Sequence, residues 1–148
     1  MLGLFDFLRR KQTPKLSPRQ ARGREGEQAA EKHLKRHGHR IIARNVTYAQ
    51  GEVDLVAQDR RTGTLCFVEV RSRDLTDGRE APVSPEQSVT LAKRRRVISA
   101  ARKFMLDHRL TGAAVRFDVV TVRFTDAGRR NPDVRHYPSA FDANGRLM

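Results

Sequence analysis

The chain contains little cysteine and few aromatic residues for its length of 148 residues. It has one cysteine, two tyrosines, seven phenylalanines and no tryptophan. Because Cys66 is alone, the chain can form neither an intrachain disulfide nor a cysteine-based zinc finger. The scarcity of aromatic side chains also argues against a stacking platform for single-stranded nucleic acid.

Long hydrophobic runs are missing as well. The apolar residues 1–8 are interrupted by Asp6 and followed by three basic residues, whereas a signal peptide places its basic residues before its apolar core. No segment approaches the roughly 20 apolar residues of a transmembrane helix. A long amphipathic stretch with tryptophan or leucine anchors, which would indicate binding to a membrane surface, is also absent. We therefore expect a cytoplasmic protein without membrane contact.

Acidic residues are strongly outnumbered. Thirty lysines and arginines stand against 17 aspartates and glutamates, which gives a net charge of +13. Such an excess favours a polyphosphate partner, which means DNA or RNA. Composition alone fits a ribosomal or chromatin-like protein held by charge equally well, so this alternative stays open here.

The apolar content of 38% is enough for one hydrophobic core. Residues 9–24 hold seven basic residues and no acidic one, and Pro14 and Pro18 interrupt regular structure. We interpret residues 1–16 as a flexible basic N-terminal arm and residues 17–148 as a single domain.

Local patterns in the first half of the chain predict one helix and three strands. The capping box Ser17-Pro18-Arg19-Gln20 begins the predicted helix, which ends at Gly38. Strands are predicted at residues 41–46, 52–57 and 65–70 from their β-branched and aromatic content. The short turns between these strands favour an antiparallel meander.

The second half of the chain predicts another helix followed by a long strand. Ser84-Pro85-Glu86-Gln87 repeats the start signal of the first helix, and apolar residues recur at helical spacing to about His108. Residues 115–124 predict a long central strand, and the tail with Tyr137 and Phe141 adds a short last one. The expected class is α/β, a mixed central sheet flanked by helices in the order α-β-β-β-α-β.

Acidic residues interrupt two of the predicted apolar strands. Side chains alternate across a strand, so Glu52 and Asp54 share one face, as do Glu69 and Arg71. Buried carboxylates are unfavourable unless they are paired or bind a cation. Because Mg²⁺ is held by one or two carboxylates with waters and phosphates, Asp54 and Glu69 form a suitable ligand pair. Arg71, about 7 Å along the strand from Glu69, would then stabilise an attacked phosphate.

Simpler interpretations exist for each of these residues. Glu52 follows a turn and fits a solvated strand end. Glu69 and Arg71 could form an ion pair on a solvent-exposed sheet face. We interpret Asp118, which also alternates with apolar residues, as a structural acid that pairs with Arg116 or with a basic helix.

A run of basic residues lies on the second predicted helix. Lys93, Arg94, Arg95 and Arg96 form a stripe suited to phosphate contacts, although a merely solvated basic face fits the run equally well. We assign nucleic-acid binding to these four residues and to Arg73, which follows the acidic strand.

Two of these segments together resemble a known protein family. Gly51-Glu52-Val53-Asp54-Leu55 and Phe67-Val68-Glu69-Val70-Arg71-Ser72-Arg73 are similar to motifs of the YraN-like (UPF0102) family of predicted endonucleases. The resemblance runs from about Gly23 to Phe124 and is specific only when its motifs are taken together. The other matching positions are Gly23-x-x-Gly26-Glu27-x-x-Ala30, Arg44-Asn45, Lys93 and Arg116-Phe117-Asp118-Val119-Val120.

This resemblance implies a restriction-endonuclease-like PD-(D/E)xK core, related to the archaeal Holliday-junction resolvases. It implies that Asp54 and Glu69 bind Mg²⁺ or Mn²⁺ and that Glu27, on the first helix, is an additional catalytic acid. Lys93 would reach DNA phosphate or the active site. Arg71 occupies the position of the superfamily's lysine, and because arginine stays protonated it is a poor general base.

The expected function is therefore metal-dependent hydrolysis of phosphodiester bonds, in branched or structured DNA. The alternative is a non-catalytic nucleic-acid-binding protein that keeps the nuclease fold. Cleavage of a symmetric junction would require a homodimer, because two cuts need two sites.

Overall fold

Two long helices and five strands lie in the part of the chain that the structure describes, which comprises residues 17–75, 84, 88–126 and 130–148 of a computed structural model. The predicted arm, residues 1–16, lies outside these residues. The elements are α2 (Pro18–Arg36), β1 (His39–Tyr48), β2 (Gly51–Asp59), β3 (Leu65–Asp74), α4 (Leu91–Asp107), β4 (Val115–Phe124) and β5 (Asp133–Phe141).

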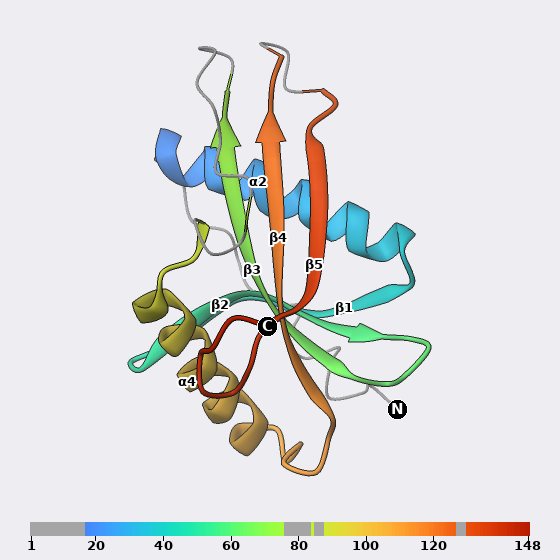
Figure 1. Cartoon of the computed structure of the whole chain (residues 1–148), viewed down its shortest axis with the longest axis vertical. Coiled ribbons are helices and arrows are strands. Elements are labelled where there is room, and N and C mark those ends of the chain that lie inside the picture. The colour runs from blue at the N-terminus through green and yellow to red at the C-terminus, as the bar shows by residue number, and fades with distance from the viewer. Residues whose placement is uncertain (1–16, 76–83, 85–87, 127–129) are drawn as a thin grey trace.

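The five strands form one mixed sheet in the order β1-β2-β3-β4-β5 (Figure 1). Strands β1, β2 and β3 pair antiparallel, as predicted from their short turns. Strand β4 is parallel to β3 and antiparallel to β5. A parallel pair needs a long crossover connection, and α4 lies within it. The predicted α/β class is confirmed, with the tail forming a full strand β5, and the arrangement is consistent with a restriction-endonuclease-like fold.

The two helices begin at different kinds of cap. At α2 the predicted capping box is present, because the Ser17 hydroxyl accepts from the Gln20 N–H and the Gln20 side chain accepts from the Ser17 N–H. Helix α4, however, begins at Leu91, so its predicted start at Ser84 is wrong. The reason is a second capping side chain, since Thr90 Oγ1 accepts from the Lys93 N–H at 3.2 Å.

The sheet buries a separate hydrophobic cluster on each face. One face packs against α4 through residues such as Phe67, Val97 and Phe104. The opposite face packs against α2 through Leu34, Val68 and their neighbours, and in Figure 1 this helix crosses behind β3, β4 and β5. Alternation along the strands thus divides them into an α4 face and an α2 face.

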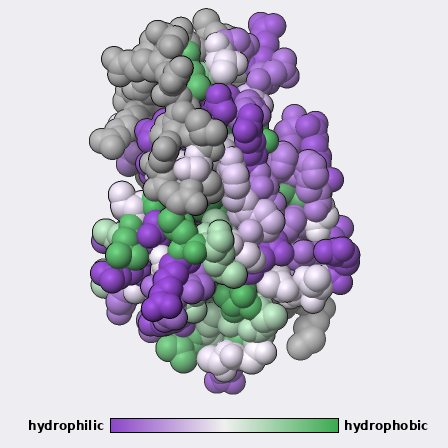
Figure 2. Space-filling model, viewed as in Figure 1, coloured by the Kyte–Doolittle hydropathy of each residue, from purple (hydrophilic) through white to green (hydrophobic). Residues whose placement is uncertain are grey.

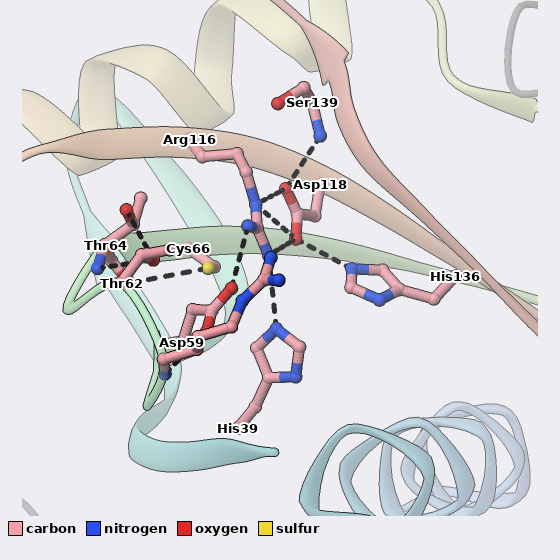
Figure 3. A network of polar contacts seen from close by, with 10 residues as sticks. His39, Asp59, Thr62, Thr64, Cys66, Arg116, Asp118, His136 and Ser139 are labelled. Atoms are coloured by element: carbon pink, nitrogen blue, oxygen red, sulfur yellow. Dashed lines mark hydrogen bonds and ion pairs between the residues drawn. The ribbon is translucent and has the colours of Figure 1, made fainter. Parts of the chain in front are cut away.

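A buried polar network stands at one end of the sheet (Figure 3). Asp118 is fully buried, and its carboxylate accepts from Arg116 Nε at 2.9 Å, from the Ser139 N–H at 3.0 Å and contacts His136 Nε2 at 2.7 Å. Burial alone would raise the pKa of Asp118, but these partners outweigh burial and lower it. The structural role predicted for Asp118, with Arg116 as its partner, is confirmed.

We expect Asp118→Asn to lower the free energy of unfolding at neutral pH by about 3 kcal/mol, because it removes one member of a buried ion pair. The folded-state pKa of Asp118 lies below its ordinary value of 3.8. Its charge therefore stabilises the fold above that value, and the contribution disappears as the pH falls through the folded-state pKa. Denaturant titrations of wild type and variant should accordingly converge in acid. The exposed Asp107→Asn serves as control, with a change within about 0.5 kcal/mol.

Candidate functional site

The sheet divides where β2 and β3 separate. These strands pair only from Leu55–Val68 to Gln58–Leu65. Beyond that point β2 continues beside β1 to Gly51, and β3 continues beside β4 to Asp74. The sheet therefore forms a fork, with β1 and β2 as one arm and β3, β4 and β5 as the other (Figure 1).

The two predicted metal-binding acids lie inside this fork. The pairing of β2 with β3 begins at Leu55, whose partner is Val68. Asp54 directly precedes Leu55, and Glu69 directly follows Val68. Asp54 Oδ2 accepts a hydrogen bond from the Val70 N–H at 2.7 Å, so a side chain replaces the backbone partner that β2 no longer supplies. The side chains of Asp54 and Glu69 are close enough for each to shift the pKa of the other.

Both carboxyl groups are held where a negative charge is unfavourable. Glu69 is 1% exposed, and its Oε2 is buried without a hydrogen-bond partner among the described residues. Burial, and then the neighbouring Asp54, raise the pKa of Glu69. Burial likewise raises the pKa of Asp54, against the opposing Val70 N–H. The pair therefore favours a shared proton or a cation, and Glu69 does not lie on a solvent-exposed face.

Helix α2 adds a third acid to the same place. Burial, and then the proximity of Asp54, raise the pKa of Glu27 to about 7, although a hydrogen bond with the Asn45 side chain opposes the shift. Asn45 itself has a φ of 49°, a left-handed conformation that asparagine tolerates. The structure thus brings Glu27 close to Asp54, as the family resemblance implied.

Lys93 of α4 reaches the fork from the other side. Its Nζ lies 3.0 Å from Glu52 Oε1 and 3.7 Å from Glu69 Oε1. Burial opposes the charge of Lys93, but Glu69 and Glu52 together raise its pKa, so its ammonium group stays protonated. Glu52 is half-exposed, as expected of a strand end, and it also holds Lys93 beside the buried acids.

The basic run on α4 divides between buried and exposed side chains. Arg94 is 9% exposed, and it donates from Nε to the Gly145 carbonyl at 2.8 Å and from Nη1 to the Val89 carbonyl at 2.6 Å. We therefore remove Arg94 from the predicted nucleic-acid contacts, because its guanidinium group binds backbone carbonyls of its own chain. Arg95 and Arg96 are exposed.

The two arginines that follow Glu69 lie on the outer part of β3. Arg71 is half-buried, and its Nε has no hydrogen-bond partner in the described ranges, whereas Arg73 is exposed. Arg71 is close enough to Glu69 to oppose the rise in its pKa. Arg71 thus lies beside Glu69, as the strand spacing predicted.

Close approach at two glycines allows the helices to pack on the arms of the fork. A Cβ atom at Gly51 would lie 2.0 Å from the Arg96 carbonyl oxygen, and one at Gly26 would lie 1.7 Å from Ser72 Oγ. Gly51 thus brings β2 against α4, and Gly26 brings α2 against β3. These contacts place Lys93 and Glu27 near the two central acids.

The donor atoms of the fork suit a hard cation. Asp54 and Glu69 offer carboxylate oxygens, and the unpartnered Glu69 Oε2 is a ready acceptor. In the described ranges no three histidine, cysteine, aspartate or glutamate side chains form a preassembled cluster able to hold a metal. Mg²⁺ does not require one, because it usually keeps several waters and takes one or two protein carboxylates with substrate phosphates.

None of the helices among the described residues is long and apolar enough to span a membrane.

The fold and the fork define a small α/β protein with acids at the centre of a divided mixed sheet. The model of the uncharacterised protein family UPF0102 matches residues 26–122, and the chain belongs to this family. A UPF0102 protein of Anaeromyxobacter dehalogenans is 48% identical over 128 residues, covering 86% of this chain and 89% of the relative. A UPF0102 protein of Desulfosudis oleivorans is 43% identical, with 87% and 96% covered. One from Myxococcus xanthus is 42% identical, with 82% and 89% covered.

We expect Gly51→Ala to lower the free energy of unfolding by about 1–3 kcal/mol, because the added methyl group collides with the backbone of α4. Urea titration followed by circular dichroism measures the change. Gly112→Ala is the matched control, since a Cβ atom there meets nothing within 4 Å. Equal stability of the two variants would contradict the close approach of β2 and α4.

Proposed function

We propose that this protein is a metal-dependent DNA endonuclease that hydrolyses phosphodiester bonds in branched or structured DNA. The carrying observation is the pair Asp54 and Glu69, two adjacent buried carboxyl groups. Oε2 of Glu69 has no hydrogen-bond partner among the described residues, and its Oε1 lies 3.7 Å from the ammonium group of Lys93. A structural ion pair would be satisfied within the chain, whereas this arrangement leaves an acceptor free for an external cation.

Asp54 and Glu69 would hold Mg²⁺ or Mn²⁺, which would supply Lewis-acid activation of water and stabilisation of charge on phosphate when bound. The Val70 N–H fixes one oxygen of Asp54 and so restricts the orientation of this carboxyl group. Glu27, whose pKa of about 7 lies near neutrality, is suited to accept a proton from a water next to Asp54.

Lys93 and Arg71 serve as cations in this proposal. Lys93 keeps its proton because Glu69 and Glu52 raise its pKa, so it stabilises negative charge on the phosphate and does not act as a base. Arg71 is permanently charged and has a free Nε–H for a phosphate oxygen. Lys93 thus supplies, from a helix, the lysine that β3 lacks.

The partner proposed is DNA, with RNA as the competing polyphosphate. The net charge of +13 favours either one. The proposed phosphate contacts are three exposed arginines: Arg73, which follows Glu69 on β3, and Arg95 and Arg96, which follow Lys93 on α4. We further propose a cytoplasmic protein, acting as a homodimer on substrates that need two symmetric cuts.

We expect wild-type protein to cleave labelled DNA with Mg²⁺ or Mn²⁺ and to leave it intact in EDTA, and Asp54→Asn to lower the cleavage rate by at least about 100-fold. The assay compares four-way junction, flap, duplex and single-stranded substrates of the same sequence. Asp107→Asn is the matched control, because it makes the same change on the exposed end of α4. Cleavage that survives Asp54→Asn would locate the activity elsewhere, for example in a contaminating nuclease.

Tight DNA binding without cleavage under every metal would overturn the enzyme and leave the non-catalytic binding protein. In that case Arg71→Lys would be the first substitution to test, because Arg71 occupies the position of the superfamily's lysine.

We expect Lys93→Gln to lower the cleavage rate about 10²-fold, comparable with removal of one oxyanion donor, because a fixed positive charge leaves the site. Single-turnover cleavage at saturating enzyme separates this effect from binding. Lys103→Gln is the matched control, since Lys103 lies on the same helix but pairs with Asp107 on its exposed surface. An equal loss in both variants would mean that the lysines act only through net charge.

A further inference from the structure

The face of the sheet that carries Glu69 packs against α4 through apolar residues. Further along β3, past Glu69, the same face carries several arginines. Strand register places neighbouring residues in rows across β3, β4 and β5, and paired residues point to the same face. Glu69 pairs with Val119, which pairs with Tyr137. The next two rows are Arg71–Thr121–Arg135 and Arg73–Arg123–Asp133.

We call Arg71, Arg73, Arg123 and Arg135 the basic face. Helix α2 lies on the other side of the sheet, where Val120 and Val122 are buried. Helix α4 contacts β2, β1 and β3. In the view of Figure 1 the upper parts of β3, β4 and β5 lie in front of α2. From the same side, Figure 2 shows hydrophilic residues predominating in the upper described part and hydrophobic ones gathering lower down.

Among the described residues, two arginines of the basic face share a single acid, Asp133. Asp133 Oδ2 lies 3.6 Å from Arg123 Nη1 and 3.3 Å from Arg135 Nε, so one carboxylate serves two guanidinium groups. The Nε atoms of Arg71 and Arg123 are buried and lack hydrogen-bond partners within the part of the chain that the structure describes. A buried N–H without an acceptor is unfavourable, so each of these groups would gain from an acceptor such as a phosphate oxygen.

We propose that the basic face binds the phosphodiester backbone of the nucleic acid on one side of the cleaved bond. This inference rests on the proposed function and specifies how the substrate lies. The backbone crosses β3, β4 and β5 outward from Glu69, so the sheet itself is the main phosphate-binding surface. Arg123 and Arg135, which are distant in sequence from the acids, thereby become phosphate-binding residues.

The test is the salt dependence of binding, measured by fluorescence anisotropy with duplex DNA in EDTA, where no cleavage takes place. We expect Arg123→Gln/Arg135→Gln to weaken binding about 10-fold and to reduce the slope of log affinity against log salt by about 2, one unit for each phosphate that is no longer bound. The matched control is Arg60→Gln/Arg61→Gln, which removes the same charge from exposed residues in the turn at the opposite end of β3.

Equal changes in the two double variants would overturn the proposal, because net charge alone would then explain them. Circular dichroism checks that each variant is folded. If Arg123→Gln unfolds the chain, Arg135→Gln alone, on a side chain that is 51% exposed, should still reduce the slope by about 1. The same measurement with an RNA duplex of the same sequence distinguishes the two sources of phosphate. If Arg123→Gln/Arg135→Gln weakened binding to RNA but not to DNA, DNA would be overturned as the partner.

Because binding is measured without metal, the proposed nuclease activity and the proposed basic face can be overturned independently of each other. A wild-type protein that binds through these arginines but never cuts supports the basic face and overturns the nuclease. A protein that cuts, with binding insensitive to Arg123 and Arg135, supports the nuclease and overturns the basic face.

Discussion

The short pairing between β2 and β3 is the constraint on which the rest of the site depends. If these strands stayed paired along their length, the Val70 N–H would be bonded to the backbone of β2 instead of to the Asp54 side chain. Their separation creates room for two carboxyl groups and gives one of them a backbone donor. The same separation allows α2 and α4 to approach the acids from different sides, each over a glycine.

Charge is distributed according to what surrounds each group. The acids lie at the centre of the fork, where burial makes a second negative charge unfavourable. Lys93 is held at the edge of the fork by Glu52 and Glu69. Arg94, its neighbour in sequence, points the other way and binds two carbonyls. Adjacent residues of one basic run thus have different physical roles.

Much of the fold was accessible from the sequence because its signals are local. Capping residues, turns and β-branched strands predicted α2 and the antiparallel meander. The proximity of Asp54 and Glu69 followed from their positions on adjacent strands. The start of α4 was missed because Ser84 and Thr90 are both competent caps, and local spacing does not decide between them.

The remaining features depend on contacts between distant segments. The position of Glu27 depends on how α2 packs on the sheet, and only the family resemblance indicated it. The burial of Arg94 did have a local signal, since it lies three residues before Val97 and seven before Ala101, on the buried stripe of α4. No local signal in the sequence indicated Arg123 and Arg135, because their place beside β3 is set by the register of β4 and β5.

The spacing of the site residues along the chain also has a consequence for the order of folding. Asp54 and Val70 are 16 residues apart, within the meander, whereas Lys93 and Glu52 are 41 residues apart. Local contacts form faster than distant ones, because less chain entropy is lost when the intervening loop closes. The paired acids can therefore meet before their lysine arrives. On this ordering, docking of α4, which brings Lys93 to Glu52 and Glu69, would follow the pairing of β2 with β3.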